Sequence, residues 1–370
     1  VLESFERLKS QADLVLIEGA GSAAEVNLRQ GDIANMGFAC ATNTPVVLIG
    51  DIDRGGVIAS IVGTHVLLPP EEQDLLAGYI INKFRGDTSL FASGDAIITA
   101  QSGLKSFGIA TFFDGAKDLP AEDAVVLDKA KLATGSKPLV VVLKLPHIAN
   151  FDDFDALAAE PGLELLYLPY DQPLPLEAAC LILPGCKTTI ADLKTLKAHG
   201  WEAELAAYLR RGGKIMGICG GYQMLGNQVD DPTGIEGDAS SIAGFGHLDI
   251  HTVMAGDKTL TRVSGKHEAS GQQVEGYEIH IGKTSGPDCQ SPHLELDGKP
   301  DGAQASNGQV VGCYLHGLFN SDAYRAAFLD WIGLDASALH YELKVEQTLD
   351  ALADHLEACL DLEALLAKAF

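Results

Sequence analysis

The chain has 370 residues and 46% of them are hydrophobic, which is enough apolar material for two domain cores. Its 26 Lys and Arg residues stand against 51 Asp and Glu residues, giving a formal net charge of −25. This balance argues against a nucleic-acid partner and against an anionic membrane surface, although a local basic pocket could still receive an anionic small substrate. No apolar run reaches the roughly 18 residues of a membrane span, and no signal-peptide pattern is present.

Cysteine usage indicates a reducing environment. The chain has seven cysteines, an odd number, and none of them forms a Cys-x-x-Cys pair. A disulfide framework and a zinc site are therefore both disfavoured, and we expect a cytoplasmic protein.

The first part of the chain reads as a parallel sheet with helices on both faces. Short continuous apolar runs alternate with helical stretches, which is typical of buried parallel strands joined by crossovers. The predicted strands are residues 14–17, 46–49, 78–81 and 109–112. Polar and glycine residues follow these runs, at the strand ends where open α/β sheets bind ligands. We take residues 1–113 as one domain.

A polar segment, 114–137, is interpreted as a linker to a second α/β domain, 138–335. Its predicted strands are residues 139–143, 165–168, 181–183, 214–218 and 310–315. Residues 227–310 are rich in Gly, Asp and His and indicate antiparallel strands and loops. The remainder, 336–370, has apolar residues at helical spacing and is predicted to be a helical tail.

The stretch GICGGYQ (217–223) places Cys219 between a predicted strand and a predicted helix, with glycines on both sides. Small neighbours permit a sharp strand-to-helix turn that lifts a nucleophile out of the sheet. Backbone N–H groups at the start of a helix favour a thiolate there. A free cysteine is most often buried and inert, but this context favours a reactive Cys219.

A thiolate nucleophile needs a general base. His316 ends the predicted strand 310–315, and a parallel pairing of that strand with 214–218 would bring it over Cys219. His280, at the end of another apolar stretch, is the second candidate.

A Pro-Gly turn after the predicted strand 181–183 suggests an oxyanion hole. The backbone N–H of Gly185 in this turn, together with that of Gly220, could bind a developing oxyanion. The alternative is an ordinary strand-to-helix turn.

The second half of the chain resembles the triad (class I-type) glutamine amidotransferases. GICGGYQ matches their nucleophile turn, and YLHGLF (314–319) matches their catalytic-histidine strand. A closer resemblance is to the cobyric acid synthase family of cobalamin biosynthesis. Stretches matching that family run through nearly the whole chain in the expected order: IEGAGSAAEVNL (17–28), GDIDRGG (50–56), INKFRGD (81–87), LPAEDAVVLD (119–128), NFDDFDAL (150–157), LPGCKTT (183–189) and GYEIHIG (276–282).

This resemblance implies a two-part reaction. Cys219 would attack the side-chain amide of glutamine, with His316 as base and then acid, giving a glutamyl thioester and ammonia. The N-terminal domain resembles the dethiobiotin-synthetase type of P-loop fold. There ATP would activate corrin carboxylates for amidation, converting adenosylcobyrinic acid a,c-diamide to adenosylcobyric acid.

The resemblance also assigns ligand-contacting residues. Glu18 and Asp51 would be Mg²⁺ ligands at the nucleotide site, because hard oxygen donors suit Mg²⁺. Asn82 resembles the base-contacting Asn of this nucleotide-binding class. The alternative for all three is that they cap the helices that follow the strands. Apart from the resemblance, four further residues are candidates for facing the corrin or a cleft between the domains: Lys187, Thr188, Tyr277 and His280.

The sequence departs from the amidotransferase pattern at two positions. The classical triad has a Glu two residues after the His, and Leu318 stands there. We expect Glu278 or a backbone carbonyl to orient His316 instead. Cys186 replaces the Ser that the family usually has after Pro-Gly, which leaves the backbone N–H of Gly185 unaffected.

A third departure concerns the nucleotide site. The phosphate-binding pattern Gly-x4-Gly-Lys-Ser/Thr is absent from the sequence. Because the family carries this loop at the start of its N-terminal domain, the sequence is interpreted as N-terminally truncated. ATP and Mg²⁺ binding by these residues alone is then not expected.

Three other functions remain open. The first is cobyrinic acid a,c-diamide synthase, which shares the two-domain plan. The second is a non-catalytic module that binds corrin or a partner, and the third is a glutaminase uncoupled from ATP and corrin. The GSAAEVNL and DIDRGG stretches favour cobyric acid synthase over the first, and the intact Cys219 and His316 argue against the second.

Overall fold

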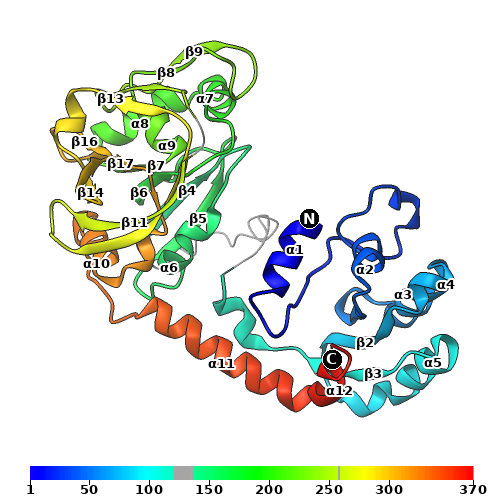
Figure 1. Ribbon diagram of the computed structural model, residues 1–370. Helices are drawn as coiled ribbons and strands as arrows, with labels where there is room; N and C mark the ends of the chain where they lie inside the picture. The colour runs from blue at the N-terminus through cyan, green and yellow to red at the C-terminus, as the bar shows by residue number, and fades with distance from the viewer. Residues whose placement is uncertain (121–134, 136, 257–258, 370) are drawn as a thin grey trace. The chain divides into compact units, whose positions relative to one another are not determined.

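The computed structural model describes residues 1–120, 135, 137–256 and 259–369 (Figure 1). The chain divides into two compact units: unit 1 comprises Val1–Leu119 and Glu346–Phe370, and unit 2 comprises Pro120–Val345. The predicted linker lies largely outside the described residues, apart from a short 3₁₀ turn, η4 (Asp114–Asp118). The predicted boundaries at 113, 137 and 335 therefore stay predictions.

Unit 1 contains a parallel three-stranded sheet in the order β1-β2-β3. Its strands are β1 (Val46–Asp51), β2 (Leu76–Phe84) and β3 (Ser106–Thr111). Its helices are α1 (Leu2–Lys9), α2 (Met36–Thr42), α3 (Val57–Leu67), α4 (Pro70–Gln73) and α5 (Ala92–Ser102). The core lies between β2, α3 and α5, and buries Tyr79, Ile81, Ile61 and Ile98. Continuous apolar strands thus form a parallel sheet, as predicted.

The predicted strand over residues 14–17 is wrong. These residues have no strand conformation, and the side chain of Leu16 is 86% exposed. An apolar run becomes a strand only where a neighbouring strand satisfies its backbone groups, and none pairs with it among the described residues. Glu18 therefore follows an irregular segment and not a strand.

The last part of the chain returns to unit 1. It forms two helices, α11 (Tyr341–Cys359) and α12 (Leu362–Leu366). The turn between them docks on β3, because Asp361 donates its N–H to the carbonyl of Phe107 at 2.8 Å. His355 Nε2 also lies 2.9 Å from the carbonyl oxygen of Thr111. The segment predicted as a helical tail is helical, and its last part covers β3.

Unit 2 is built on a six-stranded sheet in the order β16-β17-β7-β6-β4-β5. The strands are β4 (Leu139–Lys144), β5 (Glu164–Pro169), β6 (Ala178–Leu183), β7 (Lys214–Ile218), β16 (Ala303–Gln304) and β17 (Val310–Cys313). All neighbours pair in parallel except β16 with β17. The four residues Val140–Leu143 are fully buried, because helices cover both faces of the sheet.

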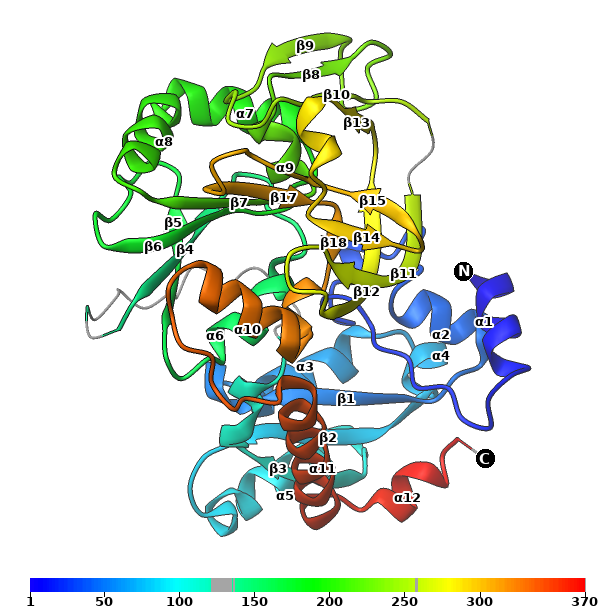
Figure 2. The ribbon, with the colours of Figure 1, turned by 90° about the vertical axis from the view of Figure 1, so that its left-hand side faces the viewer.

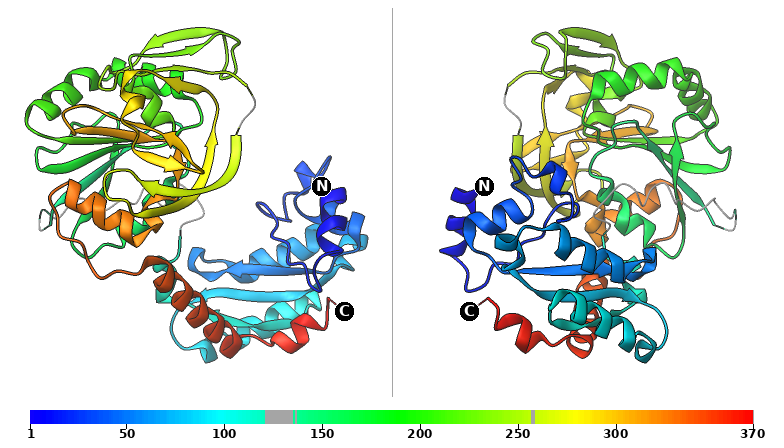
Figure 3. Two further views of the ribbon diagram at one scale, coloured as in Figure 1. Left: turned by 60° about the vertical axis from the view of Figure 1, so that its left-hand side comes forward. Right: turned by 90° about the vertical axis from the view of Figure 1, so that its right-hand side faces the viewer.

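Two sets of helices flank this sheet (Figures 2 and 3). On one face lie α7 (Thr189–Ala198), α8 (Trp201–Arg210) and α9 (Gly220–Leu225). On the other lie α6 (Asp155–Ala158) and α10 (Asp322–Trp331). Searched over the described residues, the chain has no helix that is both long and apolar enough to cross a membrane.

Two smaller sheets complete unit 2. One has the order β15-β14-β11-β12-β18, and all of its pairings are antiparallel. Its strands are β11 (Thr259–His267), β12 (Gln273–His280), β14 (Leu294–Leu296), β15 (Lys299–Asp301) and β18 (Leu315–His316). The other is β13-β10-β8-β9, formed by β8 (Gln228–Asp231), β9 (Ser240–Ala243), β10 (His251–Val253) and β13 (Lys283–Ser285). Apart from the parallel pair β8–β10, the predicted antiparallel region is antiparallel.

Candidate active site

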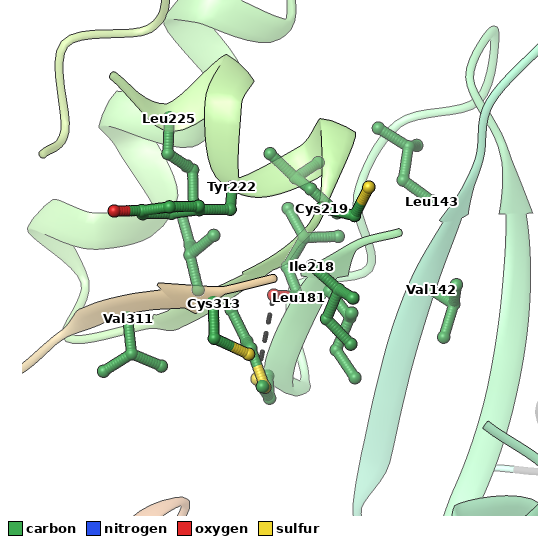
Figure 4. Close-up of a cluster of buried hydrophobic side chains, with 14 of the residues drawn as sticks. Val142, Leu143, Leu181, Ile218, Cys219, Tyr222, Leu225, Val311 and Cys313 are labelled. Atoms are coloured by element: carbon green, nitrogen blue, oxygen red, sulfur yellow. Dashed lines mark hydrogen bonds between the residues drawn. The ribbon is translucent and has the colours of Figure 1, made fainter. Parts of the chain in front are cut away.

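Cys219 lies at the sharp turn between β7 and α9 (Figure 4). Its φ of 51° and ψ of −111° are uncommon for a residue with a side chain, and holding such a conformation costs about 1–3 kcal/mol. A Cβ at Gly217 would lie 2.6 Å from the Cα of Tyr222, and one at Gly221 would lie 2.0 Å from the carbonyl oxygen of Leu183. The two glycines are therefore required for the close approach of helix and strand that this turn makes.

His316 lies at the end of β18, and its side chain is completely buried. β17 pairs in parallel with β7, as the sequence predicted, and Cys313 lies opposite Ile218 in the register of the two strands. Burial by itself would lower the pKa of His316. The Asp153 carboxylate, followed by the Cys219 side chain, outweighs burial and raises the pKa to about 10. The imidazole is therefore protonated at neutral pH.

Asp153 is the acidic partner of His316. It comes from η6 (Phe151–Phe154), the 3₁₀ turn that follows β4, and its Oδ2 lies 2.7 Å from His316 Nδ1. Its Oδ1 accepts the backbone N–H of Gly317 at 2.8 Å. We expected Glu278 or a backbone carbonyl to orient His316, and this expectation is wrong. The partner of Nδ1 is the Asp153 carboxylate, while Glu278 Oε1 lies 3.8 Å from His280 Nε2.

Two further side chains contact the His316 ring. Tyr277 on β12 is the register partner of His316, and the two rings stack with centroids 5.3 Å apart and planes 18° apart. Asn150 Nδ2 lies 3.1 Å from each ring nitrogen. The imidazole is therefore restrained by contacts with its ring as well as through Asp153.

Gly185 and Gly220, predicted to form an oxyanion hole, both lie beside Cys219. A Cβ at Gly185 would lie 3.0 Å from His316 Cε1 and 3.7 Å from Cys219 Cβ. Gly220 is the first residue of α9, directly after Cys219, and a Cβ there would lie 2.5 Å from Cys186 Sγ. The structure thus brings together all four residues predicted for the reaction centre.

A buried amide, Gln223, connects the segments around this centre. Its Oε1 accepts the hydroxyl of Thr189 at 2.9 Å. Its Nε2 donates to the carbonyl of Ile281 and to the Tyr314 hydroxyl oxygen, both at 3.1 Å. Sequence reasoning gave Gln223 no role, because these partners are far from it in the chain.

Glu236 fixes the loop that carries Gly185. Its two carboxylate oxygens accept the backbone N–H groups of Thr189 and Ile190, each at 3.0 Å. These residues open α7, directly after the loop Pro184–Thr188. A carboxylate at this end of a helix satisfies N–H groups that have no partner within the helix.

The residues assigned to the corrin or the cleft lie on two segments. Lys187 and Thr188 follow the Gly185 turn, and the Thr188 hydroxyl is buried without a partner in the described part of the chain. His280 stacks on Tyr314 with ring centroids 3.8 Å apart. Tyr277 lies on His316, as described above. Their contact with a substrate stays a prediction.

Asp51, the last residue of β1 in unit 1, is the register partner of Asn82, which lies two residues before the end of β2. Lys83 Nζ lies 2.8 Å from Asp51 Oδ2, and this hydrogen bond is the main reason that the pKa of Asp51 is lowered. Within the described residues, no three His, Cys, Asp or Glu side chains are grouped as a metal site. The carboxylate of Asp51 is thus paired with an ammonium, which does not fit a ready-made Mg²⁺ site. The assignment of Glu18 and Asp51 to Mg²⁺, and of Asn82 to a nucleotide, stays a prediction.

Comparisons with known proteins agree with this geometry. Residues 139–324 match the family described as the CobB/CobQ-like glutamine amidotransferase domain. The chain is 55% identical to the cobyric acid synthase of Cereibacter sphaeroides strain ATCC 17025, over 100% of this chain and 76% of that protein. It is 53% identical to the cobyric acid synthase of Methylorubrum populi, over 99% of this chain and 75% of that protein. It is 54% identical to a cobyric acid synthase of Rhodobacter capsulatus, over 100% of this chain and 76% of that protein.

Proposed function

Because the chain belongs to the cobyric acid synthase family of glutamine amidotransferases, we propose that unit 2 hydrolyses glutamine with Cys219 as the nucleophile and His316 as its acid and base. The observation that carries this proposal is the position of a strained cysteine turn beside a buried, carboxylate-paired histidine. Neither feature is needed for a module that only binds corrin or a partner. The chain was also predicted to be cytoplasmic, and we keep that proposal because its seven cysteines are all free thiols.

In the first half of the reaction, the sulfur of Cys219 attacks the side-chain amide carbon of glutamine. In this step His316 takes up the thiol proton, and Asp153 stabilises the imidazolium that results. The new carbon–sulfur bond places negative charge on the amide oxygen, next to the backbone N–H groups of Gly185 and Gly220. His316 then donates its proton to the nitrogen, the carbon–nitrogen bond breaks, and ammonia leaves.

In the second half, a water molecule attacks the thioester carbon. His316, now neutral, takes a proton from this water, and the carbon–sulfur bond breaks to release glutamate. His316 thus acts once as acid and once as base. His316 must give and take these protons at Nε2, because Nδ1 is hydrogen-bonded to Asp153.

The ammonia would amidate peripheral carboxylates of a corrin, converting adenosylcobyrinic acid a,c-diamide to adenosylcobyric acid. The support for this acceptor is the chain's similarity to relatives named cobyric acid synthase. These names favour it over the related a,c-diamide synthase reaction. ATP would supply the activation of each carboxylate. Within unit 1, the strand ends that carry Asp51 and Asn82 are the proposed nucleotide side of the sheet.

Ammonia release from glutamine tests the proposal. Cys219→Ser should abolish hydrolysis, because a serine hydroxyl without further activation is a far poorer nucleophile than a thiolate. Cys40→Ser is the matched control, since Cys40 is exposed and lies in unit 1. Hydrolysis that persists in Cys219→Ser would overturn the proposal. Loss in Cys40→Ser as well would point to a general effect of cysteine removal.

A further inference from the structure

We infer that Asp153 is the positioning residue of this reaction centre: it fixes the tautomer and the orientation of His316. This inference rests on the proposed glutamine hydrolysis. It gives the orienting role to a residue that precedes Cys219 in the chain. The position two residues after the histidine is held by an apolar side chain, Leu318.

The geometry of the carboxylate leaves it little freedom. Both oxygens are engaged, Oδ2 with His316 Nδ1 at 2.7 Å and Oδ1 with the N–H of Gly317 at 2.8 Å. Since an ionised carboxylate is an acceptor only, Nδ1 must carry a hydrogen, which leaves Nε2 as the atom that exchanges its proton with Cys219. The Asp153 side chain is 2% exposed, so water does not compete effectively for either bond.

The turn that carries Asp153 is anchored on both sides. The Asp153 N–H donates to the carbonyl of Asn150 at 3.1 Å. The next residue, Phe154, is fully buried and packs against the rings of Tyr167 and Phe319, with centroids 6.3 and 6.2 Å away. Phe319 lies three residues after His316, so one aromatic contact ties the aspartate's turn to the histidine's turn.

Leu318 cannot orient His316, because its side chain has no hydrogen-bonding group, and the surroundings of position 318 do not suit a carboxylate. Its side chain is 1% exposed and belongs to the hydrophobic core of unit 2. A carboxylate at 318 would have to be buried among apolar groups, at a high desolvation cost. Asp153 avoids this cost because its two oxygens meet two N–H donors.

Asp153→Asn separates the positioning role from a purely structural one. The Asn carbonyl can still accept the N–H of Gly317, so the turn keeps that bond. The Asn amide group would face Nδ1, which must then accept a hydrogen bond and leave the proton on Nε2. In that tautomer Nε2 cannot take a proton from the thiol. We expect kcat for glutamine hydrolysis to fall by roughly 10²–10⁴-fold with little change in KM.

The matched control is Asp152→Asn, which removes the same charge from the adjacent, exposed position. Asp152 has no hydrogen bond to His316 and interacts with its ring only through a weak electrostatic attraction, so kcat should stay within about 2-fold of the wild type. The second readout is the pH dependence of alkylation at Cys219 by iodoacetamide. Alkylation of Asp152→Asn should follow the same pH profile as the wild type, and the profile of Asp153→Asn should be displaced to more alkaline pH.

Asp153→Glu keeps the charge and should restore part of kcat and of the alkylation profile. A kcat within a few-fold of the wild type in Asp153→Asn, or an unshifted alkylation profile, would overturn the inference. If Asp153→Asn does not fold, as judged by circular dichroism, the pH dependence of Cys219 alkylation in Asp153→Glu tests the inference instead. A profile no different from that of Cys219 in urea-unfolded protein would support a structural role only.

These outcomes are distinguishable from failure of the proposed function. If Cys219→Ser still hydrolyses glutamine, the proposed reaction is wrong whatever Asp153 does. If Cys219→Ser is inactive and Asp153→Asn is fully active, the reaction stands and only the positioning role of Asp153 is wrong.

Discussion

Cys219 donates its backbone N–H to the carbonyl oxygen of Cys313 at 2.9 Å. This bond extends the parallel pairing of β7 and β17 by one residue, so both chains leave the sheet at the same edge. Cys219 turns into α9 there, and the other chain continues to His316 in β18. Two residues that are far apart in the sequence are thus brought to one place by the register of two neighbouring strands.

The first prediction concerns Gly185. A methyl group there would lie 3.0 Å from His316 Cε1 and 3.5 Å from the carbonyl of Ala149, so Gly185→Ala must displace the histidine or the loop. A contact of this length is relieved by a shift of a few tenths of an ångström, so the loss in rate should be smaller than the roughly 10²-fold that a 1 Å misplacement of a catalytic group costs. Steady-state glutamine hydrolysis should show that loss in kcat, with a small change in the unfolding midpoint.

Gly162→Ala is the control for Gly185→Ala. Gly162 is in the same unit, and a Cβ there would meet nothing within 4 Å. This variant should be as active as the wild type. Equal activity of the two alanine variants would show that Gly185 does not lie against the reacting histidine.

The second prediction concerns Glu236. Because its carboxylate accepts two N–H groups at the start of α7, Glu236→Ala should lower the free energy of unfolding by about 1 kcal/mol. It should also lower kcat, since α7 follows directly on the loop that holds Gly185. Urea denaturation and ammonia release measure the two effects. Asp238→Ala, at an exposed position in the neighbouring turn, should change neither.

The third prediction uses the buried carboxyl of Asp301. Burial is the main cause that raises the pKa of Asp301 to about 7, and the negative charge of Glu278 raises it further. The hydrogen bond from the Tyr314 N–H and the charge of His280 act in the opposite direction and lower the pKa. In the unfolded chain the ordinary value is 3.8. Between these two values the folded protein holds a proton that the unfolded chain has lost. The contribution of Asp301 to stability is therefore complete below about pH 4 and is lost as the pH rises to about 7.

Asp301→Asn removes this dependence while keeping an acceptor for the N–H of Tyr314. The free energy of unfolding of the variant minus that of the wild type should rise by up to about 4 kcal/mol as the pH is raised from 4 to 8. Urea denaturation at the two pH values measures the difference. If the stability difference between variant and wild type is the same at pH 4 and pH 8, Asp301 titrates as an ordinary exposed carboxyl and the prediction is wrong.

The sheets and the candidate nucleophile could be predicted from the sequence because the patterns that indicate them lie within short stretches of the chain. Continuous apolar runs such as 139–143 and 214–218 can be buried only between helices, and glycines on both sides of Cys219 are required by its turn. The run at 14–17 shows the limit of this reasoning, since burial depends on a partner strand and not on the run itself. Asp153 was missed because its contact with His316 spans 163 positions of the sequence. In the sequence Asp153 is seen only as part of an acidic pair between two phenylalanines after a buried strand. That pattern indicates a role beside a histidine only when the arrangement of the strands is known.

The central claim, that Cys219 is the nucleophile for glutamine, is tested most directly by covalent labelling. The diazoketone analogue of glutamine, 6-diazo-5-oxonorleucine, has a ketone carbon in place of the amide carbon of glutamine and an alkylating diazo carbon in place of the amide nitrogen, so the thiolate is alkylated at that carbon with loss of N2. After incubation with the whole chain, mass spectrometry of its peptides should find one adduct, on Cys219, and excess glutamine should suppress it. An unlabelled Cys219, or labelling spread over the exposed Cys40 and other cysteines and insensitive to glutamine, would contradict the account.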